Sequence, residues 1–203
     1  MSGYTWPDIL TGLVRSEGLE ATAATWALNE ILAGRASEVQ VAALLTALRA
    51  KGETEDEIAG LADAMLANAL PIALDPDAVD IVGTGGDRAN TVNISTMAAI
   101  VAAGAGAKVV KHGSRAASSM SGTADTLEAM GVKIDVEPSK QAVILDEVGI
   151  VFLFAQMYHP AMKNVAGVRK ALGIQTTFNF LGPLADPARP RAMALGVAND
   201  DVA

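Results

Sequence analysis

The pattern of apolar and polar positions divides the chain into two parts. Through the first 70 residues, apolar side chains recur at the three- and four-residue spacing of amphipathic helices. We expect helices at about residues 7–16 and 20–33, and two more that begin after Ser37 and Thr54. Each of these two residues is followed three positions later by Gln or Glu, the capping-box pattern of a helix start. The wide apolar faces have two interpretations: packing within the chain, or contact with a partner subunit.

The pattern changes after residues 71–78, which contain two prolines and two aspartates and are typical of a linker. Beyond them, short apolar runs at 79–82, 108–111, 132–134, 150–154 and 192–197 predict strands. Helical stretches are expected between them, at about 95–104, 121–130, from about 139, and at 161–172. Such alternation favours a parallel sheet. The expected fold class is therefore α/β, with a helical domain over 1–70, the linker over 71–78, and a parallel-sheet α/β domain over 79–203.

Composition and charge narrow the function classes. The chain has no Cys, which excludes a disulfide scaffold, a thiolate metal site and a Cys nucleophile. The net charge of -8 disfavours nucleic-acid binding, because that binding requires a basic surface. Residues 1–80 hold 13 acidic and 4 basic residues, whereas residues 81–203 hold 10 and 11, so an anionic ligand is expected in the second part. No run of about 18 apolar residues and no basic, then apolar, N-terminal leader occurs. We expect a soluble cytoplasmic protein with no membrane partner.

A glycine-rich turn, Gly83-Thr84-Gly85-Gly86-Asp87, follows the first predicted strand. Glycines permit close backbone approach, and successive N–H groups in such a turn can bind an anion. The spacing matches neither the P-loop nor the Rossmann pattern. Alone, the turn is equally consistent with a tight strand exit that binds nothing.

Neighbouring segments favour a phosphate ligand. Asn93-Ile94-Ser95-Thr96 lies where a helix begins, and helix N-termini attract phosphate, although Ser95 or Thr96 could be an ordinary N-cap. Lys111-His112-Gly113-Ser114-Arg115 follows the second predicted strand, and hydroxyls at Ser118, Ser119, Ser121 and Thr123 come next. The carboxyl ends of parallel strands are where ligands bind in open α/β sheets. These loops together suit a ligand with several phosphates, and Asp87 adds a carboxylate for a bridging Mg²⁺.

At these residues the chain resembles the anthranilate phosphoribosyltransferases, glycosyltransferases of tryptophan biosynthesis. The matching motifs are Asp80 to Asp87, Asn93 to Thr96, Lys111-His112-Gly113 with Arg115, Ser118-Ser119, Ser121-Gly122, His159-Pro160-Ala161, Arg169, Phe178-Asn179 and Leu181 to Leu184. The resemblance implies a homodimer that forms through the N-terminal helices, and an α/β domain of the phosphoribosyltransferase and nucleoside-phosphorylase type. It also implies transfer of phosphoribosyl from phosphoribosyl pyrophosphate to anthranilate, with Mg²⁺ as cofactor.

The resemblance assigns site residues by position. The residues expected to bind phosphoribosyl pyrophosphate are Gly83, Thr84, Gly85, Gly86, Asp87, Thr91, Asn93, Ile94, Ser95, Thr96, Lys111, His112, Gly113, Ser114, Arg115, Ala116, Ala117, Ser118, Ser119 and Thr123. Those expected to meet anthranilate are Gly83, Ser114, His159 and Arg169, and Ser95 is the expected Mg²⁺ ligand. No residue is expected to act as a covalent nucleophile. His112 has two interpretations, proton removal or turn stabilisation; His159 either shapes the anthranilate entry or is a satisfied buried histidine.

Some positions depart from the family pattern. Ser114 stands where the family usually has Asn, Gln156 where it often has Pro, and Ala185-Asp186-Pro187 where it has a Thr-Asn-Pro-like turn. Family members continue well past Ala203 with an acidic Asp-Glu pair for Mg²⁺, so we expect a sheet that is incomplete at the C-terminus and little transferase activity from this chain alone. The alternatives are a pyrimidine nucleoside phosphorylase, a nucleic-acid-binding homologue and an inactive dimerising fragment. The absent Lys-His-Ser turn disfavours the first, and the lack of a basic patch disfavours the second.

Overall fold

The computed structural model describes residues 3–85, 92–116 and 122–198, and its chain forms two compact units. The helical unit comprises Met1–Ala69 and His159–Ala185, and the sheet unit comprises Leu70–Tyr158 and Asp186–Ala203. Packing thus adds residues 159–185 to the helices expected over the first 70 residues. The linear domain boundaries at 70 and 79 stay a prediction.

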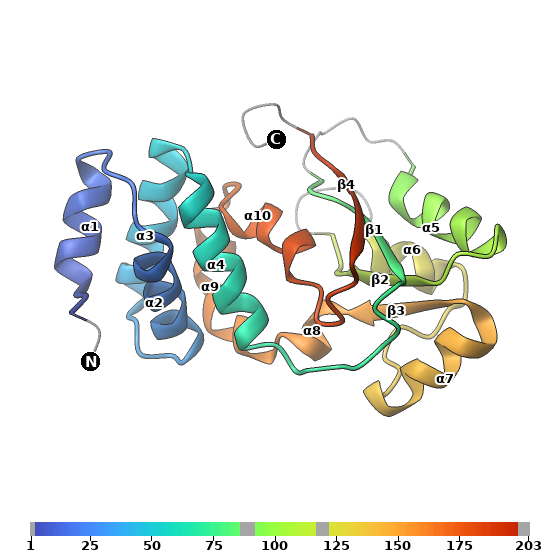
Figure 1. The fold of residues 1–203 in the computed structure, drawn as a ribbon. Coiled ribbons are helices and arrows are strands. Elements are labelled where there is room, and N and C mark those ends of the chain that lie inside the picture. Colours follow the sequence, from blue (N-terminus) through green and yellow to red (C-terminus); the bar gives the residue numbers. More distant parts are fainter. Residues whose placement is uncertain (1–2, 86–91, 117–121, 199–203) are drawn as a thin grey trace. The chain divides into compact units, whose positions relative to one another are not determined.

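The helical unit confirms the four helices expected at the N-terminus (Figure 1). Its elements are α1 (Trp6–Val14), α2 (Ala21–Leu32), α3 (Glu38–Lys51), α4 (Glu55–Ala67), η1 (Pro160–Met162), α9 (Lys163–Leu172), α10 (Phe178–Leu181) and η2 (Pro183–Ala185). Leucines, isoleucines and alanines of α1 to α4 form one core with Val165 and Val168 of α9 and with Phe178 and Leu181 of α10. The small-residue composition allows close helix packing, most clearly between α2 and α4, where a Cβ at Gly60 would lie 2.1 Å from the Ala21 carbonyl oxygen.

Both predicted capping boxes are present. The Ser37 hydroxyl accepts from the Gln40 amide at 3.3 Å, and the Gln40 side chain accepts from the Ser37 amide at 2.9 Å. Thr54 and Glu57 repeat the arrangement at the start of α4. The start of each helix is therefore determined by a local sequence signal that satisfies N–H groups without a partner inside the helix.

The cap at Ser37 gives a measurable prediction. Ser37→Ala should lower the free energy of unfolding by about 1 kcal/mol, because the Gln40 amide loses its acceptor. Urea unfolding followed by tryptophan fluorescence measures this change. The matched control is Thr46→Ala at an exposed position of the same helix, which helix propensity should stabilise by a few tenths of a kcal/mol. Equal effects of the two substitutions would contradict the capping role.

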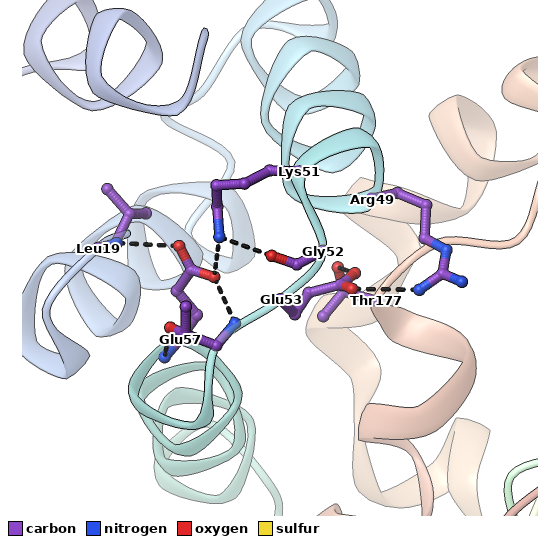
Figure 2. Close-up of polar contacts among 8 residues, drawn as sticks. Leu19, Arg49, Lys51, Gly52, Glu53, Glu57 and Thr177 are labelled. Carbon is purple, nitrogen blue, oxygen red and sulfur yellow. Dashed lines mark hydrogen bonds and ion pairs between the residues drawn. The ribbon is translucent and has the colours of Figure 1, made fainter. Parts of the chain in front are cut away.

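A buried carboxylate joins three helix ends in the helical unit (Figure 2). Glu57 is fully buried; one of its oxygens accepts from the Leu19 amide at 2.9 Å, and the other accepts from the Thr54 amide at 2.8 Å and from Lys51 Nζ at 2.9 Å. A buried charge is tolerated only when it is paired and hydrogen-bonded. These contacts therefore allow Glu57 to hold the approach to α2, the end of α3 and the start of α4 together.

Within the described residues, the sheet unit has four parallel strands in the order β3-β2-β1-β4. Its elements are β1 (Val79–Gly83), α5 (Ile94–Gly104), β2 (Val109–Gly113), α6 (Thr123–Ala129), α7 (Pro138–Val148), β3 (Ile150–Phe154), α8 (Ala155–Tyr158) and β4 (Ala192–Gly196). In register, Val79 lies opposite Ala192 and Gly83 opposite Gly196, while Val109 lies opposite Ile150. Because all four strands are parallel, their carboxyl ends meet at one edge of the sheet.

One predicted strand is wrong. Residues 132–134 do not pair with a neighbouring strand, because the Val132 amide and the Ile134 side chain make other contacts. The Val132 amide donates to the Leu127 carbonyl at 2.9 Å and terminates α6, and Gly131 adopts a φ of +81° there. Ile134 is buried beside Leu127 and Phe154 without joining the sheet. In the described residues, no helix is long and apolar enough to cross a membrane.

Candidate functional site

The glycine-rich turn lies where the strand order reverses. The chain runs from β1 to β2 to β3 and then places β4 on the other side of β1. In open α/β sheets, ligands bind outside the carboxyl ends of strands at such a reversal. Gly83 ends β1, Gly85 has a φ of +65°, and the Thr84 amide donates to the Gly196 carbonyl of β4 at 2.9 Å. The turn is therefore held against β4 and carries a left-handed backbone position that favours glycine.

Sequence reasoning missed the part that the end of β4 plays in this turn. The Ala198 amide donates to the Thr84 hydroxyl at 3.3 Å, and that hydroxyl donates to the Gly85 carbonyl at 3.3 Å. Nothing in the local sequence around Ala198 signals the contact, since it depends on the parallel pairing of β1 with β4.

The start of α5 lies beside the turn in the chain and is capped by Asn93. The Asn93 side-chain oxygen accepts from the Thr96 amide at 3.1 Å and from the Ser95 hydroxyl at 3.1 Å. Neither Ser95 nor Thr96 is the N-cap, so that part of the sequence interpretation is corrected. A side-chain carbonyl can both cap the first turn and orient the serine, which leaves the 11-residue helix with an ordered N-terminus.

Lys111 connects the two neighbouring strands with α5. Its side chain is 2% exposed; Nζ donates to the Ile81 carbonyl at 2.5 Å and to the Ser95 hydroxyl at 3.3 Å. Burial lowers the pKa of Lys111 to about 8, and the nearby Asp80 charge opposes that shift. The site therefore holds a buried amine near the predicted phosphate turn, supported from β1, β2 and α5.

Two buried carboxyl groups, Asp80 and Asp186, lie close enough to interact, and Asp80 also interacts with the Lys111 charge. The sequence did not identify the two carboxyl groups as a pair. Asp80 accepts from the His112 amide at 3.4 Å, and Asp186 accepts from the Ala188 amide at 2.8 Å. Burial raises the pKa of Asp80 to about 6; burial and the Asp80 charge together raise the pKa of Asp186 to about 8. The second carboxyl oxygen of each residue, Oδ2, is buried without a hydrogen-bond partner among the described residues, which favours the protonated form of the pair. The departure at Ala185-Asp186-Pro187 was the only sequence signal of this pair.

The segment after β2 packs on the start of α6. A Cβ at Gly113 would lie 3.1 Å from the Thr123 Cβ. Gly113 and Thr123, both expected to bind phosphoribosyl pyrophosphate, are therefore neighbours. The Ser114 hydroxyl donates to the Arg115 carbonyl at 3.0 Å, and the Ser114 carbonyl accepts from the Ala124 amide at 3.2 Å. The Ala116 amide donates to Asp125 at 2.9 Å. His112 is buried within β2.

The residues expected to meet anthranilate are divided between the two units. Gly83 and Ser114 belong to the sheet unit, and His159 and Arg169 belong to the helical unit. His159 Nε2 lies 2.9 Å from the Ala185 carbonyl oxygen, and burial lowers the pKa of the imidazole. The Arg169 guanidinium lies 5.4 Å from the centre of the Phe178 ring, and burial lowers its pKa. Both histidine and arginine are thus held by neighbours within their own unit.

Several expected ligands lie outside the described residues: Gly86, Asp87, Thr91, Ala117, Ser118 and Ser119, together with Ser121. Among the residues that the structure describes, no three His, Asp or Glu side chains gather as a metal site. Ser95, the expected magnesium ligand, has its hydroxyl oxygen 3.3 Å from the Lys111 ammonium, a poor environment for a second cation. The described residues therefore do not by themselves fit Mg²⁺.

Comparisons with known proteins agree with this geometry. Two family models match, the helical bundle domain of a glycosyl transferase family over residues 7–69 and the a/b domain of the same family over residues 75–203. An anthranilate phosphoribosyltransferase of Arthrobacter sp. (strain FB24) is 54% identical over 202 residues, which is 100% of this chain and 57% of that protein. One from Nocardioides sp. (strain ATCC BAA-499 / JS614) is 54% identical over 98% of this chain and 58% of its own length.

Solved structures give the same result. The anthranilate phosphoribosyltransferase of Thermus thermophilus has a TM-score of 0.88 and 45% identity, covering 96% of this chain and 59% of that one. The Saccharomyces cerevisiae enzyme in complex with PRPP and Mg has a TM-score of 0.87 and 34% identity, covering 100% of this chain and 61% of that one. The chain thus spans about three-fifths of the length of these relatives. With both of its domains matched in order along the sequence, the chain belongs to the glycosyl transferase family that is built from a helical bundle domain and an a/b domain.

Proposed function

We propose that the protein takes part in the transfer of phosphoribosyl from phosphoribosyl pyrophosphate to the amine of anthranilate. The products would be N-(5-phosphoribosyl)anthranilate and pyrophosphate, the second step of tryptophan synthesis from chorismate. The observation that carries the proposal is the arrangement at the carboxyl edge of the sheet. There the Gly83–Gly85 turn follows β1, Asn93 caps the start of α5, and Lys111 is held beside Ser95 by β2.

The residues of this edge would bind and stabilise the departing pyrophosphate. Backbone N–H groups of the glycine-rich turn and of the α5 N-terminus donate to phosphate oxygens, and the helix dipole favours negative charge there. The Lys111 ammonium adds a positive charge in a water-poor position, where its effect on an anion is strengthened. Catalysis would then consist of positioning and of stabilising charge on the leaving group, with no covalent intermediate.

Anthranilate would be bound by its carboxylate and presented by its amine. Arg169 offers a planar fork suited to a carboxylate, and stacking on Phe178 orients that fork. His159 stays neutral near pH 7 because burial lowers its pKa, so it shapes the site rather than adding charge. An aromatic amine is already neutral at pH 7, so no strong base is required to activate it. Ser114, in the sheet unit, stands where the family usually has Asn and offers a single hydroxyl in its place.

Mg²⁺, a homodimer and a cytoplasmic location belong to the same proposal. The Mg²⁺ in the yeast structure with PRPP supports a role for the ion beside pyrophosphate. The described residues do not form a site for the ion by themselves. The N-terminal helices would supply the dimer surface, and Val14 of α1 and Val39 of α3 are exposed there.

Pyrophosphate binding tests the anion site directly. Lys111→Met should weaken the affinity for magnesium pyrophosphate at least tenfold, or about 1.4 kcal/mol, because it removes the buried positive charge while keeping the side-chain length. Isothermal titration calorimetry measures the affinity, and circular dichroism checks that the variant is folded. The control is Lys133→Met, an exposed lysine of the same unit, which should bind like the unsubstituted chain.

Two outcomes would contradict the proposal. Equal affinities of Lys111→Met and Lys133→Met for magnesium pyrophosphate would show that Lys111 does not contribute to anion binding. Phosphorolysis of thymidine, without any consumption of anthranilate when the chain is mixed with phosphoribosyl pyrophosphate, would favour a nucleoside phosphorylase. Loss of anthranilate fluorescence in that mixture measures transfer.

A further inference from the structure

Arg115, expected to bind phosphate, is already engaged by acidic side chains. Both terminal nitrogens of its guanidinium contact the Glu128 carboxylate, with Nη2 donating to Oε1 at 2.8 Å. Nη1 also donates to Asp125 at 3.3 Å. The guanidinium carbon lies 5.6 Å from the centre of the Phe154 ring. A fork that is bidentate to one carboxylate and stacked on an aromatic ring has its preferred geometry satisfied within the protein.

One of these carboxylates, Asp125, also binds the backbone at Ala116 and at Gly122. Asp125 Oδ2 accepts from the Ala116 amide at 2.9 Å and from the Gly122 amide at 2.7 Å. Gly122 leaves no room between α6 and the preceding segment, since a Cβ there would lie 2.4 Å from the Ala116 nitrogen and 2.7 Å from the Ser114 carbonyl oxygen. Residues 114–116 therefore pack closely against the first turn of α6, where Asp125 accepts a hydrogen bond from Ala116.

The charge balance of this group opposes a phosphate. Arg115 contributes one positive charge, and Asp125 and Glu128 contribute two negative charges. The pKa values of both carboxyl groups are lowered, for Asp125 mainly by the Ala116 and Gly122 amides and for Glu128 mainly by Arg115, so both stay ionised at neutral pH. A phosphate that used the Arg115 fork would have to displace Glu128 and approach a group with a net negative charge.

We propose that Arg115 is a positioning residue that holds Ser114 and Ala116 against α6 through Glu128 and Asp125, rather than a direct ligand of phosphate. This inference depends on the proposed function only for the identity of the ligand that would bind beside residues 114–116. This role of Arg115 reverses the expected effect of neutralising Glu128 on ligand affinity. If Arg115 bound phosphate directly, neutralising Glu128 would release the guanidinium and strengthen binding. If Arg115 acts through Glu128, neutralising either partner weakens binding.

The test uses Arg115→Gln, Glu128→Gln and the double variant, with Glu137→Gln as control because it breaks another exposed ion pair of the sheet unit. The first readout is amide hydrogen exchange at Ala116 and Gly122 in the unliganded chain. We expect each single variant to speed this exchange several-fold and the double variant to add little, because the two residues act as one unit. The second readout is magnesium pyrophosphate affinity, which should fall about threefold to tenfold in both single variants and not further in the double variant.

Each result decides the question. Exchange at Ala116 and Gly122 that is unchanged in Glu128→Gln overturns the proposal, as does tighter pyrophosphate binding by that variant. Faster exchange in both single variants supports it even if no variant binds pyrophosphate, an outcome that would count against the proposed function alone.

Discussion

Gly60→Ala is expected to lower the free energy of unfolding of the helical unit by about 3 kcal/mol, the range of severe overpacking. A Cβ at this position would lie 2.1 Å from the Ala21 carbonyl oxygen and 2.8 Å from its carbonyl carbon. These are backbone atoms of the first turn of α2, so a rotamer change cannot relieve the contact. The Thr25 hydroxyl also donates to the Gly60 carbonyl at 2.9 Å, so separating α2 from α4 would break a further contact.

The two tryptophans of the chain make this effect measurable in the helical unit alone. Trp6 and Trp26 both belong to that unit, with ring centres 5.5 Å apart, so their fluorescence follows its unfolding in urea. The control is Gly167→Ala in α9, where the described residues leave a Cβ open space within 4 Å. Alanine has the better helix propensity, so the control should gain about 0.5 kcal/mol. A Gly60→Ala variant as stable as the control would contradict the close packing of α2 on α4.

Local signals explain why most helices and strands were predictable from the sequence. The boxes at Ser37 and Thr54 mark helix starts within a few residues, and the run 150–154 is a strand with those bounds. The run 132–134 shows the limit of such signals. A strand requires a neighbour to pair with, and the Val132 amide is already used to end α6. Likewise, no local pattern indicates that residues 159–185 pack with the N-terminal helices, because that depends on contacts between distant segments.

The candidate site also contains residues that local sequence predicts and residues that only the fold brings together. The glycine-rich turn and the segment from Lys111 could be recognised because their chemistry is contiguous in the sequence. Asn93 was expected at the helix start, but its role as the cap became clear only from the bonds of Ser95 and Thr96. Asp80 with Asp186 could not be predicted, since parallel pairing and a chain excursion through the other unit bring the two together.

That carboxyl pair should make the stability of the sheet unit fall as the pH rises. The pKa of Asp80 is raised to about 6 and that of Asp186 to about 8, so the folded chain holds protons that the unfolded chain releases near pH 4. The stabilising contribution is complete below the unfolded pKa and is lost as the pH passes through the folded values. Of the groups facing the pair, Lys111 has a lowered pKa near 8 and opposes the loss only above that pH, and Tyr158 has a raised pKa and stays neutral.

Asp186→Asn should remove most of this dependence. Between pH 5 and pH 8 the unsubstituted chain is expected to lose about 5 kcal/mol of stability in the sheet unit, and the variant less than half of that. The Asn amide is neutral at every pH, so it cannot repel the ionised Asp80 carboxylate. Because both tryptophans lie in the helical unit, the measurement is urea unfolding followed by the folded-state amide resonances of β1 and β2.

The control for the carboxyl pair is Asp135→Asn, an exposed aspartate of the sheet unit. It changes the same functional group without touching the pair, so it should keep the full loss between pH 5 and pH 8. If Asp186→Asn loses as much stability as this control, the ionisation of Asp186 does not cause the loss. If Asp186→Asn is instead as stable as the unsubstituted chain at pH 5 and more stable at pH 8, the ionisation of Asp186 is what destabilises the fold as the pH rises. That divergence is the result we expect, because the amide can replace the protonated carboxyl group at pH 5 and carries no charge to repel Asp80 at pH 8.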